Sequence, residues 1–121
     1  MKKILQIEDH PASRLLIERI LQPHGYEILH ADTGEGGITL ALAEKPDLIL
    51  IDMGLPDIDG QTVVTHLRQN PNFSRVPIVA ITAWPPETAA EMAQRYGCDG
   101  CIVKPIDIAR FPAEIAAYLP R

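Results

Sequence analysis

Five polar side chains in this sequence come directly after short apolar stretches. Glu8 and Asp9 follow "ILQI", Asp52 follows "LILI", Thr82 follows "IVAI", and Lys104 follows "CIV". A carboxylate is costly to bury unless it is paired or bound to a metal, so its place beside apolar residues needs a physical reason. Three carboxylates, a hydroxyl and an ammonium group would form one polar site if the fold brings them together.

Such a set of groups suits a phosphoryl group held beside a divalent cation. Carboxylates packed together repel and raise each other's pKa, and a hard cation removes that cost. Mg²⁺ prefers oxygen ligands and keeps several waters, usually with one or two carboxylates. The metal and the lysine would neutralise phosphoryl oxygens, the threonine hydroxyl could donate to one of them, and an exposed carboxylate could act as the nucleophile.

The elements that must position these residues follow from the pattern of apolar residues. Short β-rich stretches alternate with longer amphipathic ones, and Gly25 and Gly97 mark two helix ends. The predicted strands span residues 3–7, 26–30, 48–51, 76–81 and 101–103. The predicted helices span residues 13–21, 34–44, 61–69, 87–96 and 107–119.

Alternating strands and helices indicate an α/β fold with three layers, in which helices cover both faces of a five-stranded parallel sheet. The strands at 48–51 and 76–81 are apolar without alternation, as central strands are, and the more polar strand at 26–30 is expected at an edge. Right-handed crossovers leave few strand orders, and we expect 2-1-3-4-5, the doubly wound (βα)5 flavodoxin-like order. Ligands then bind at the carboxyl ends of the strands, where the five polar residues lie.

Four segments together carry a family resemblance: "QIEDH", "LILIDMGLPDIDG", "IVAITA" and "CDGCIVKPID". In this order and spacing they resemble the receiver domain of bacterial two-component response regulators, and the match runs nearly from end to end. Each motif alone would be weak. The acidic pair, the D-x-x-L-P-x-x-D-G stretch, the T-A and the K-P are specific in combination.

The resemblance implies a metal site and a phosphoacceptor among the acidic residues. Asp52 would accept the phosphoryl group of a phosphohistidine as an acyl phosphate. Mg²⁺ would be held by Asp52, by Asp9 directly, by Glu8 partly through water, and by the main-chain carbonyl of Gly54.

The resemblance also assigns the residues that follow the last two strands. Lys104 would pair with a phosphate oxygen. Thr82, beside Ala83 in the T-A motif, would swing toward the phosphate and carry the signal to the helix predicted at 87–96. The peptide bond between Lys104 and Pro105 would be cis, a state found in only ~5–6% of X-Pro bonds.

Three positions affect how this receiver would work. Cys101 stands where receivers usually have an aromatic residue, so we expect a muted or different switch on that face. Gly54, two residues after Asp52, has no side chain, and Trp84, two residues after Thr82, has a large one. By the resemblance, positions 54 and 84 tune access of water to the acyl phosphate, and the Trp84 ring could shield it. Packing or a contact with a partner protein is the simpler role for this ring.

Other candidate residues have simpler interpretations than a functional one. Asp57 and Asp59 could be further ligands, but turn and helix-cap roles are favoured. Cys98 and Cys101 could be a redox pair or half of a zinc site. No second Cys/His pair follows them and they precede a strand, so reduced thiols are favoured. The four histidines lack metal-ligand spacing, and His10 is expected at the rim of the acidic site.

Length and charge limit the remaining classes. The 121 residues fit a single domain over 1–121. The net charge of −5 disfavours nucleic acid or an anionic membrane as the main partner. No apolar stretch approaches the ~20 residues of a membrane span, and residues 1–7 do not form a signal peptide. We therefore expect a cytoplasmic protein.

The leading interpretation is a single-domain receiver with Mg²⁺ as cofactor, which catalyses only its own phosphorylation and dephosphorylation. A histidine kinase or histidine phosphotransfer protein would dock near residues 11–16, and a downstream target protein would bind the helices at 87–96 and 107–119. A receiver excised from a hybrid histidine kinase or larger regulator is an alternative. Less favoured are a Mg²⁺-dependent phosphohydrolase using Asp52 as nucleophile, which would need a second acid-base carboxylate and a cap, and a receiver that binds without phosphorylation.

Overall fold

The computed structural model describes residues 1–53, 55 and 59–119. Within these residues a single sheet contains β1 (Lys3–Ile7), β2 (Glu27–Ala31), β3 (Leu48–Asp52), β4 (Ile78–Thr82) and β5 (Gly100–Val103). The α-helices are α1 (Pro11–Leu21), α2 (Gly34–Glu44), α3 (Gly60–Arg68), α4 (Pro86–Tyr96) and α5 (Phe111–Tyr118). Two 3-10 helices, η1 (Gln22–His24) and η2 (Pro71–Phe73), follow α1 and α3.

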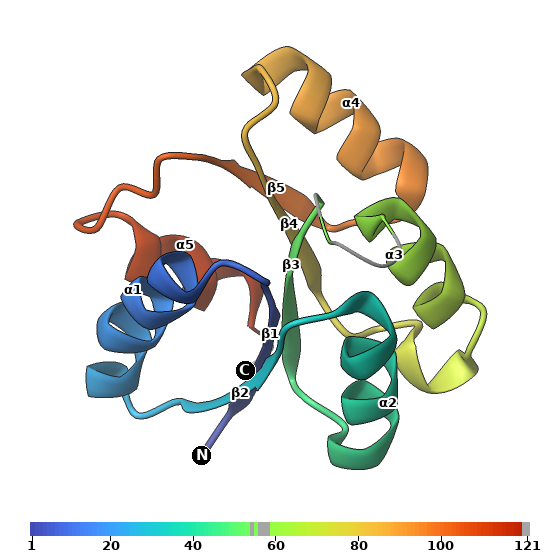
Figure 1. Ribbon diagram of the computed structural model, residues 1–121, viewed down its shortest axis with the longest axis horizontal. Coiled ribbons are helices and arrows are strands. Elements are labelled where there is room, and N and C mark those ends of the chain that lie inside the picture. The colour runs from blue at the N-terminus through green and yellow to red at the C-terminus, as the bar shows by residue number, and fades with distance from the viewer. Residues whose placement is uncertain (54, 56–58, 120–121) are drawn as a thin grey trace.

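The sheet is parallel and its strand order is β2-β1-β3-β4-β5, which confirms the predicted flavodoxin-like arrangement. Helices α1 and α5 lie on one face, and α2, α3 and α4 lie on the other (Figure 1). The register pairs Ile7 with Ile51 and Asp52 with Ile81. The residues that follow β1 and the last residues of β3 and β4 therefore meet at the carboxyl ends of the strands.

The central strands are apolar on both faces because each face is covered by helices. All five residues of β3 and of β4 are buried. Toward α1 and α5, Leu48 and Leu50 pack with Phe111 in one cluster. Toward α2 and α3, Ile49 and Ile51 pack with side chains of α3 in a second cluster. Each fully buried aliphatic side chain stabilises the fold by about 1.5–3 kcal/mol. The packing of β3 therefore fixes the position of Asp52, its last residue.

Two glycines let helices approach the strands that carry the acidic residues. A Cβ atom on Gly37 of α2 would lie 2.5 Å from Cδ1 of Ile7, and one on Gly60 of α3 would lie 2.7 Å from Cα of Met53. Both distances are well below van der Waals contact. Larger residues at these positions would push α2 away from the end of β1 and α3 away from the residue after Asp52.

The element bounds agree with the predicted ones to within two residues, apart from the start of the last helix. That helix was predicted from 107 but begins at Phe111. The Asp107 carboxylate accepts hydrogen bonds from the main-chain N–H groups of Ala109 and Arg110 and folds the chain into a turn instead. None of the helices within the described residues has the length and apolar character needed to cross a membrane.

Candidate functional site

The acidic residues that follow β1 and end β3 form a cluster, as the sequence predicted. Carboxylate oxygens of Glu8, Asp9 and Asp52 all lie within 4.8 Å of one another. Glu8 is 2% exposed and Asp52 is 8% exposed. The cluster arises because β1 and β3 are neighbours, and the register pairs Ile7, the last residue of β1, with Ile51, the residue before Asp52.

Lys104 supplies the positive charge that faces this cluster. Its Nζ lies 3.6 Å from Oδ2 of Asp52 and 3.8 Å from Oε2 of Glu8. The main-chain N–H of Lys104 donates to the carbonyl of Thr82 at 2.7 Å, which fixes the residue at the end of β5. The Lys104–Pro105 peptide bond is cis, as predicted.

The cluster has three carboxylates, and the Lys104 ammonium lies near two of them, those of Glu8 and Asp52. Burial raises the pKa of Glu8 to about 7, and the negative charge of Asp52 adds to the rise. The Lys104 ammonium and the hydrogen bond from the main-chain N–H of His10 lower the pKa of Glu8 but do not offset these effects. The site is therefore short of positive charge.

The ligands available in the cluster fit a hard divalent cation. All three side chains offer oxygen, the ligand that Mg²⁺ prefers. Oδ1 of Asp9 is buried and has no hydrogen-bond partner within the described part of the chain, which is unusual for a carboxylate oxygen. A cation would satisfy that oxygen. The predicted fourth ligand, the main-chain carbonyl of Gly54, lies outside the described residues.

Thr82 and Trp84 border the cluster on the β4 side. The Thr82 side chain is nearly buried at the end of β4, and its Oγ1 accepts a hydrogen bond from the main-chain N–H of Trp84 at 3.1 Å. Trp84 is half-buried against the core cluster on the α2–α3 side, and Cys101 packs against the same cluster. Ala83, between Thr82 and Trp84, is exposed.

The two cysteines are free thiols, in agreement with the favoured interpretation. Burial raises the pKa of Cys98 to about 11 and raises the pKa of Cys101. Since the thiolate is the reactive form, both residues are poor nucleophiles at neutral pH. They line a groove of about 460 Å³ between α4 and α5, where Tyr118 lies across Gly100.

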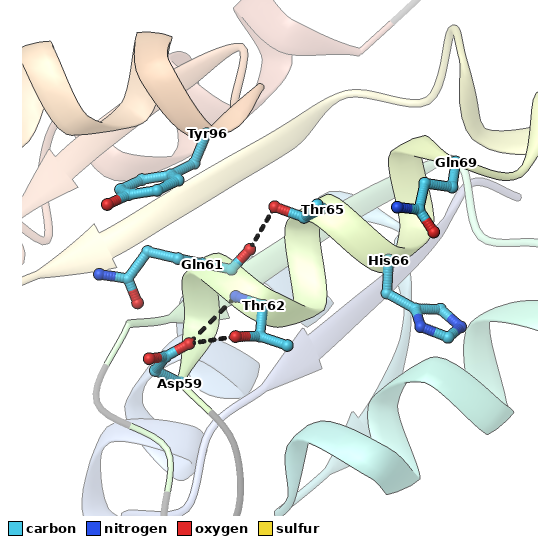
Figure 2. Close-up of a pocket in the computed structure, with 7 residues that line it drawn as sticks. All are labelled: Asp59, Gln61, Thr62, Thr65, His66, Gln69 and Tyr96. Carbon is cyan, nitrogen blue, oxygen red and sulfur yellow. Dashed lines mark hydrogen bonds between the residues drawn. The ribbon is translucent and has the colours of Figure 1, made fainter.

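A second groove runs between α3 and α4 and contains none of the acidic cluster. It has a volume of about 450 Å³, and its lining is polar, with Tyr96 on the α4 side (Figure 2). Asp59 lies at its end, where it accepts hydrogen bonds from the N–H and hydroxyl groups of Thr62. This confirms Asp59 as the cap of α3, whereas Asp57 lies outside the described residues.

Two residues that contact the main chain of the acidic pair were not identified from the sequence. Nε2 of His30 lies 3.2 Å from the main-chain oxygen of Glu8, and Nη1 of Arg14 lies 3.3 Å from Nδ1 of His30. His30 and Arg14 are 16 positions apart, so no local motif joins them. The register of β1 and β2, which pairs Gln6 with His30, is the signal that could have placed His30 near the acidic pair.

Comparison with known proteins agrees with this geometry. Residues 4–116 match the response regulator receiver domain family. The polar-differentiation response regulator DivK of Brucella anthropi is 31% identical over 118 residues, which cover 98% of this chain and 96% of DivK.

Solved structures show the same fold. The chemotaxis response regulator CheY4 of Vibrio cholerae has a TM-score of 0.92 and 26% identity, covering 98% of this chain and 99% of CheY4. The receiver domain of the sensor histidine kinase PA1611 from Pseudomonas aeruginosa, with magnesium in its active-site cleft, has a TM-score of 0.88 and 29% identity, covering 97% of this chain and 96% of that domain. The acidic cluster fits the phosphorylation site of such proteins, and this chain belongs to the family of response regulator receiver domains.

Proposed function

We propose that Asp52 is the phosphoacceptor of this receiver. The observation that carries the proposal is the place of its carboxylate, at the end of buried β3 and 3.6 Å from the Lys104 ammonium. A carboxylate oxygen of Asp52 would attack the phosphorus of a phosphohistidine. The new P–O bond forms as the P–N bond breaks, and the leaving imidazole takes up a proton.

The metal in this proposal is Mg²⁺, held by Glu8, Asp9 and Asp52, with the carbonyl of Gly54 as a further ligand. Its support is the all-oxygen ligand set and the unpartnered Oδ1 of Asp9. When bound, the cation would neutralise charge on the phosphoryl oxygens. The magnesium ion in the PA1611 receiver domain is consistent with this assignment.

Lys104 and Thr82 are proposed to bind the phosphoryl oxygens. Lys104 already faces both Glu8 and Asp52, so its ammonium needs little movement to pair with a phosphate oxygen. The Thr82 hydroxyl would turn to donate to another oxygen and would give up the hydrogen bond from the Trp84 N–H. Because α4 begins at Pro86, a change at Trp84 would reach the start of that helix. Cys101 stands on β5 where receivers usually have an aromatic residue, so the proposed route from Thr82 through Trp84 to α4 does not require such a residue. The proposed switch surface also includes Ala83 and Pro105.

The proposed phosphodonor is a histidine kinase or a histidine phosphotransfer protein. An apolar hollow of about 420 Å³ lies beside Lys104 and is lined by Ser13, Leu16, Pro105 and Ile106. Leu16 and the nearby Leu15 are exposed apolar residues of α1, which suits a protein partner. Such donors derive their phosphoryl group from ATP, so we place the protein in the cytoplasm.

The output is proposed to be a contact with a downstream target protein through the groove between α4 and α5. The chain would then act as a single receiver domain, residues 1–121, that catalyses only its own phosphorylation and dephosphorylation. A receiver that functions within a hybrid histidine kinase or a larger regulator is the alternative, since the receiver domain of the sensor histidine kinase PA1611 matches nearly the whole chain.

The test is incubation with acetyl phosphate or phosphoramidate and Mg²⁺, followed by intact mass measurement. We expect a single phosphoryl adduct that depends on Mg²⁺ and is absent in Asp52→Asn. Asp59→Asn is the matched control, because asparagine also caps helices well and Asp59 lies outside the acidic cluster. No adduct on the wild-type protein would refute the proposal, and sustained turnover of a small phosphomonoester would favour a phosphohydrolase.

A further inference from the structure

A chain of hydrogen bonds joins α1, β2 and the end of β1 behind the acidic cluster. Nε2 of the buried Gln6 donates to the main-chain oxygen of Arg14 at 3.1 Å. Nη1 of Arg14 lies 3.3 Å from Nδ1 of His30, and Nε2 of His30 lies 3.2 Å from the main-chain oxygen of Glu8. The series begins at Gln6 and ends at Glu8, the residues on either side of Ile7 at the end of β1.

The partners of His30 determine which ring nitrogen carries the proton. The Arg14 guanidinium can only donate, so Nδ1 must accept. The Glu8 carbonyl can only accept, so Nε2 must carry the proton and donate. The ring is thus a bridge that receives one hydrogen bond from α1 and gives one to the end of β1.

The bond from His30 acts on the peptide unit that connects two of the three clustered acidic residues. A peptide unit is planar, so its carbonyl oxygen and the next N–H move together. The Glu8 carbonyl belongs to the plane that joins Glu8 to Asp9. The N–H of Glu8 also donates to the carbonyl of Ala31 at 2.9 Å, and the Glu8 carboxylate accepts from the N–H of His10 at 3.1 Å.

We propose that His30 and Arg14 are positioning residues for the metal-binding carboxylates. By holding the Glu8–Asp9 peptide plane, they keep both carboxylates directed at the cation before it arrives, and less ordering is left for the binding step. This inference rests on the proposed function, since it requires that Glu8 and Asp9 bind Mg²⁺.

Two substitutions of His30 separate its two hydrogen bonds. The amide of asparagine reaches the place of Nδ1 and can still accept from Arg14, but it cannot reach the Glu8 carbonyl. The amide nitrogen of glutamine reaches the place of Nε2 and can still donate to that carbonyl. In calorimetric titrations with MgCl₂ we expect His30→Asn to weaken Mg²⁺ binding by about tenfold, and His30→Gln to restore most of the affinity.

Arg14→Met provides an independent variant that leaves β2 untouched. It removes the donor to His30 Nδ1 but keeps the Glu8 contact, so we expect weaker Mg²⁺ binding than in wild type and tighter binding than in His30→Asn. The matched control is His66→Asn, on the exposed side of α3. Its Mg²⁺ affinity should equal that of the wild type.

Urea unfolding of every variant distinguishes positioning from stability. A purely structural role would lower the free energy of unfolding and leave the Mg²⁺ affinity of the folded protein unchanged. That result in His30→Asn and Arg14→Met, with Mg²⁺-dependent phosphorylation of wild-type Asp52 intact, would overturn this inference and leave the proposed function standing. Absence of Mg²⁺ binding by the wild-type protein would overturn both.

Discussion

Glu8 lies almost fully buried between a carboxylate and an ammonium group, Asp52 and Lys104. Burial and the Asp52 charge raise its pKa from 4.5 to about 7. In the metal-free protein the raised pKa keeps the Glu8 carboxyl mostly protonated at pH values below about 7. The stability that this proton contributes is fully present below pH 4.5 and is lost as pH rises through about 7.

The same titration predicts a pH-dependent affinity for Mg²⁺. A metal ligand must be deprotonated, so Mg²⁺ has to displace the Glu8 proton at pH values below its pKa. We expect the affinity to fall by up to about tenfold per pH unit below pH ~7 and to level off above it. Calorimetry in buffers of different ionisation enthalpy would measure the released proton. Glu8→Gln should lose this pH dependence, and equal wild-type affinities at about pH 6 and pH 8 would contradict the prediction.

Trp84 is the candidate residue for controlling access of water to a phosphorylated Asp52. Its main-chain N–H donates a hydrogen bond to the Thr82 hydroxyl, next to the acidic cluster. We expect Trp84→Ala to lose the phosphoryl group faster, by up to about tenfold, which corresponds to about 1.4 kcal/mol of activation free energy. The time course of dephosphorylation by intact mass measures this, with Trp84→Phe as the control that keeps a ring. An unchanged rate in Trp84→Ala would refute shielding.

Among the secondary-structure elements, α3 is tied to its surroundings through one side chain at its last residue, Arg68. The guanidinium donates to the carbonyls of Phe73, Val76 and Gly97 at 2.6, 2.8 and 2.9 Å. It also pairs with Asp99 at 2.7 Å, and the same carboxylate oxygen accepts from the N–H of Ile78. Arg68 therefore joins α3, the end of α4 and the starts of β4 and β5.

Removal of the Arg68 guanidinium should destabilise the fold without altering the chemistry. Arg68→Ala leaves several acceptors without a donor, and we expect a loss of about 2–4 kcal/mol in the free energy of unfolding. Urea unfolding measures this, with Arg75→Ala on the exposed loop after η2 as the control. Phosphorylation of the folded fraction should be unchanged, because these contacts lie at the opposite edge of the sheet. A loss no larger than that of Arg75→Ala would contradict the prediction.

The order of elements and the acidic cluster were both predictable from the sequence. Apolar spacing identifies each strand, and parallel strands place the residues that follow them at one edge, which brought Glu8, Asp52 and Lys104 together. The late start of α5 was not predictable from spacing, because the Asp107 turn competes with the helix over residues with helical spacing. The contacts of Arg68 and His30 depend on strand register and on side-chain direction, neither of which can be read from apolar spacing.

At the scale of the whole molecule, two surfaces lie at different ends of β5. Lys104, just after the strand, borders the hollow beside α1. Gly100 and Cys101, in its first half, line the groove between α4 and α5 with Tyr118. Both surfaces are therefore built on one strand, which places the proposed phosphodonor and target contacts on separate parts of the protein.

This separation predicts a variant that distinguishes protein donors from small ones. Leu16→Gln puts a neutral polar side chain in the hollow beside Lys104. It should slow phosphorylation by a phosphorylated histidine phosphotransfer protein by about tenfold or more, because an amide buried against the partner without a hydrogen bond costs free energy. Phosphorylation by acetyl phosphate should be unchanged. Intact mass time courses with both donors measure this, and Leu42→Gln, at an exposed position of α2, is the control. Equal slowing with both donors would argue against a docking role for α1.

The position of Trp84 has a practical consequence. The chain contains a single tryptophan, so its emission under selective excitation reports on one place only. That place is the loop between β4 and α4, where the indole is partly shielded from solvent and its main chain touches Thr82. In the proposed function, metal binding, phosphoryl transfer and hydrolysis would all occur near Thr82, which the main chain of this residue contacts. Stopped-flow spectroscopy can therefore follow each event in the unlabelled protein and resolve its order in time.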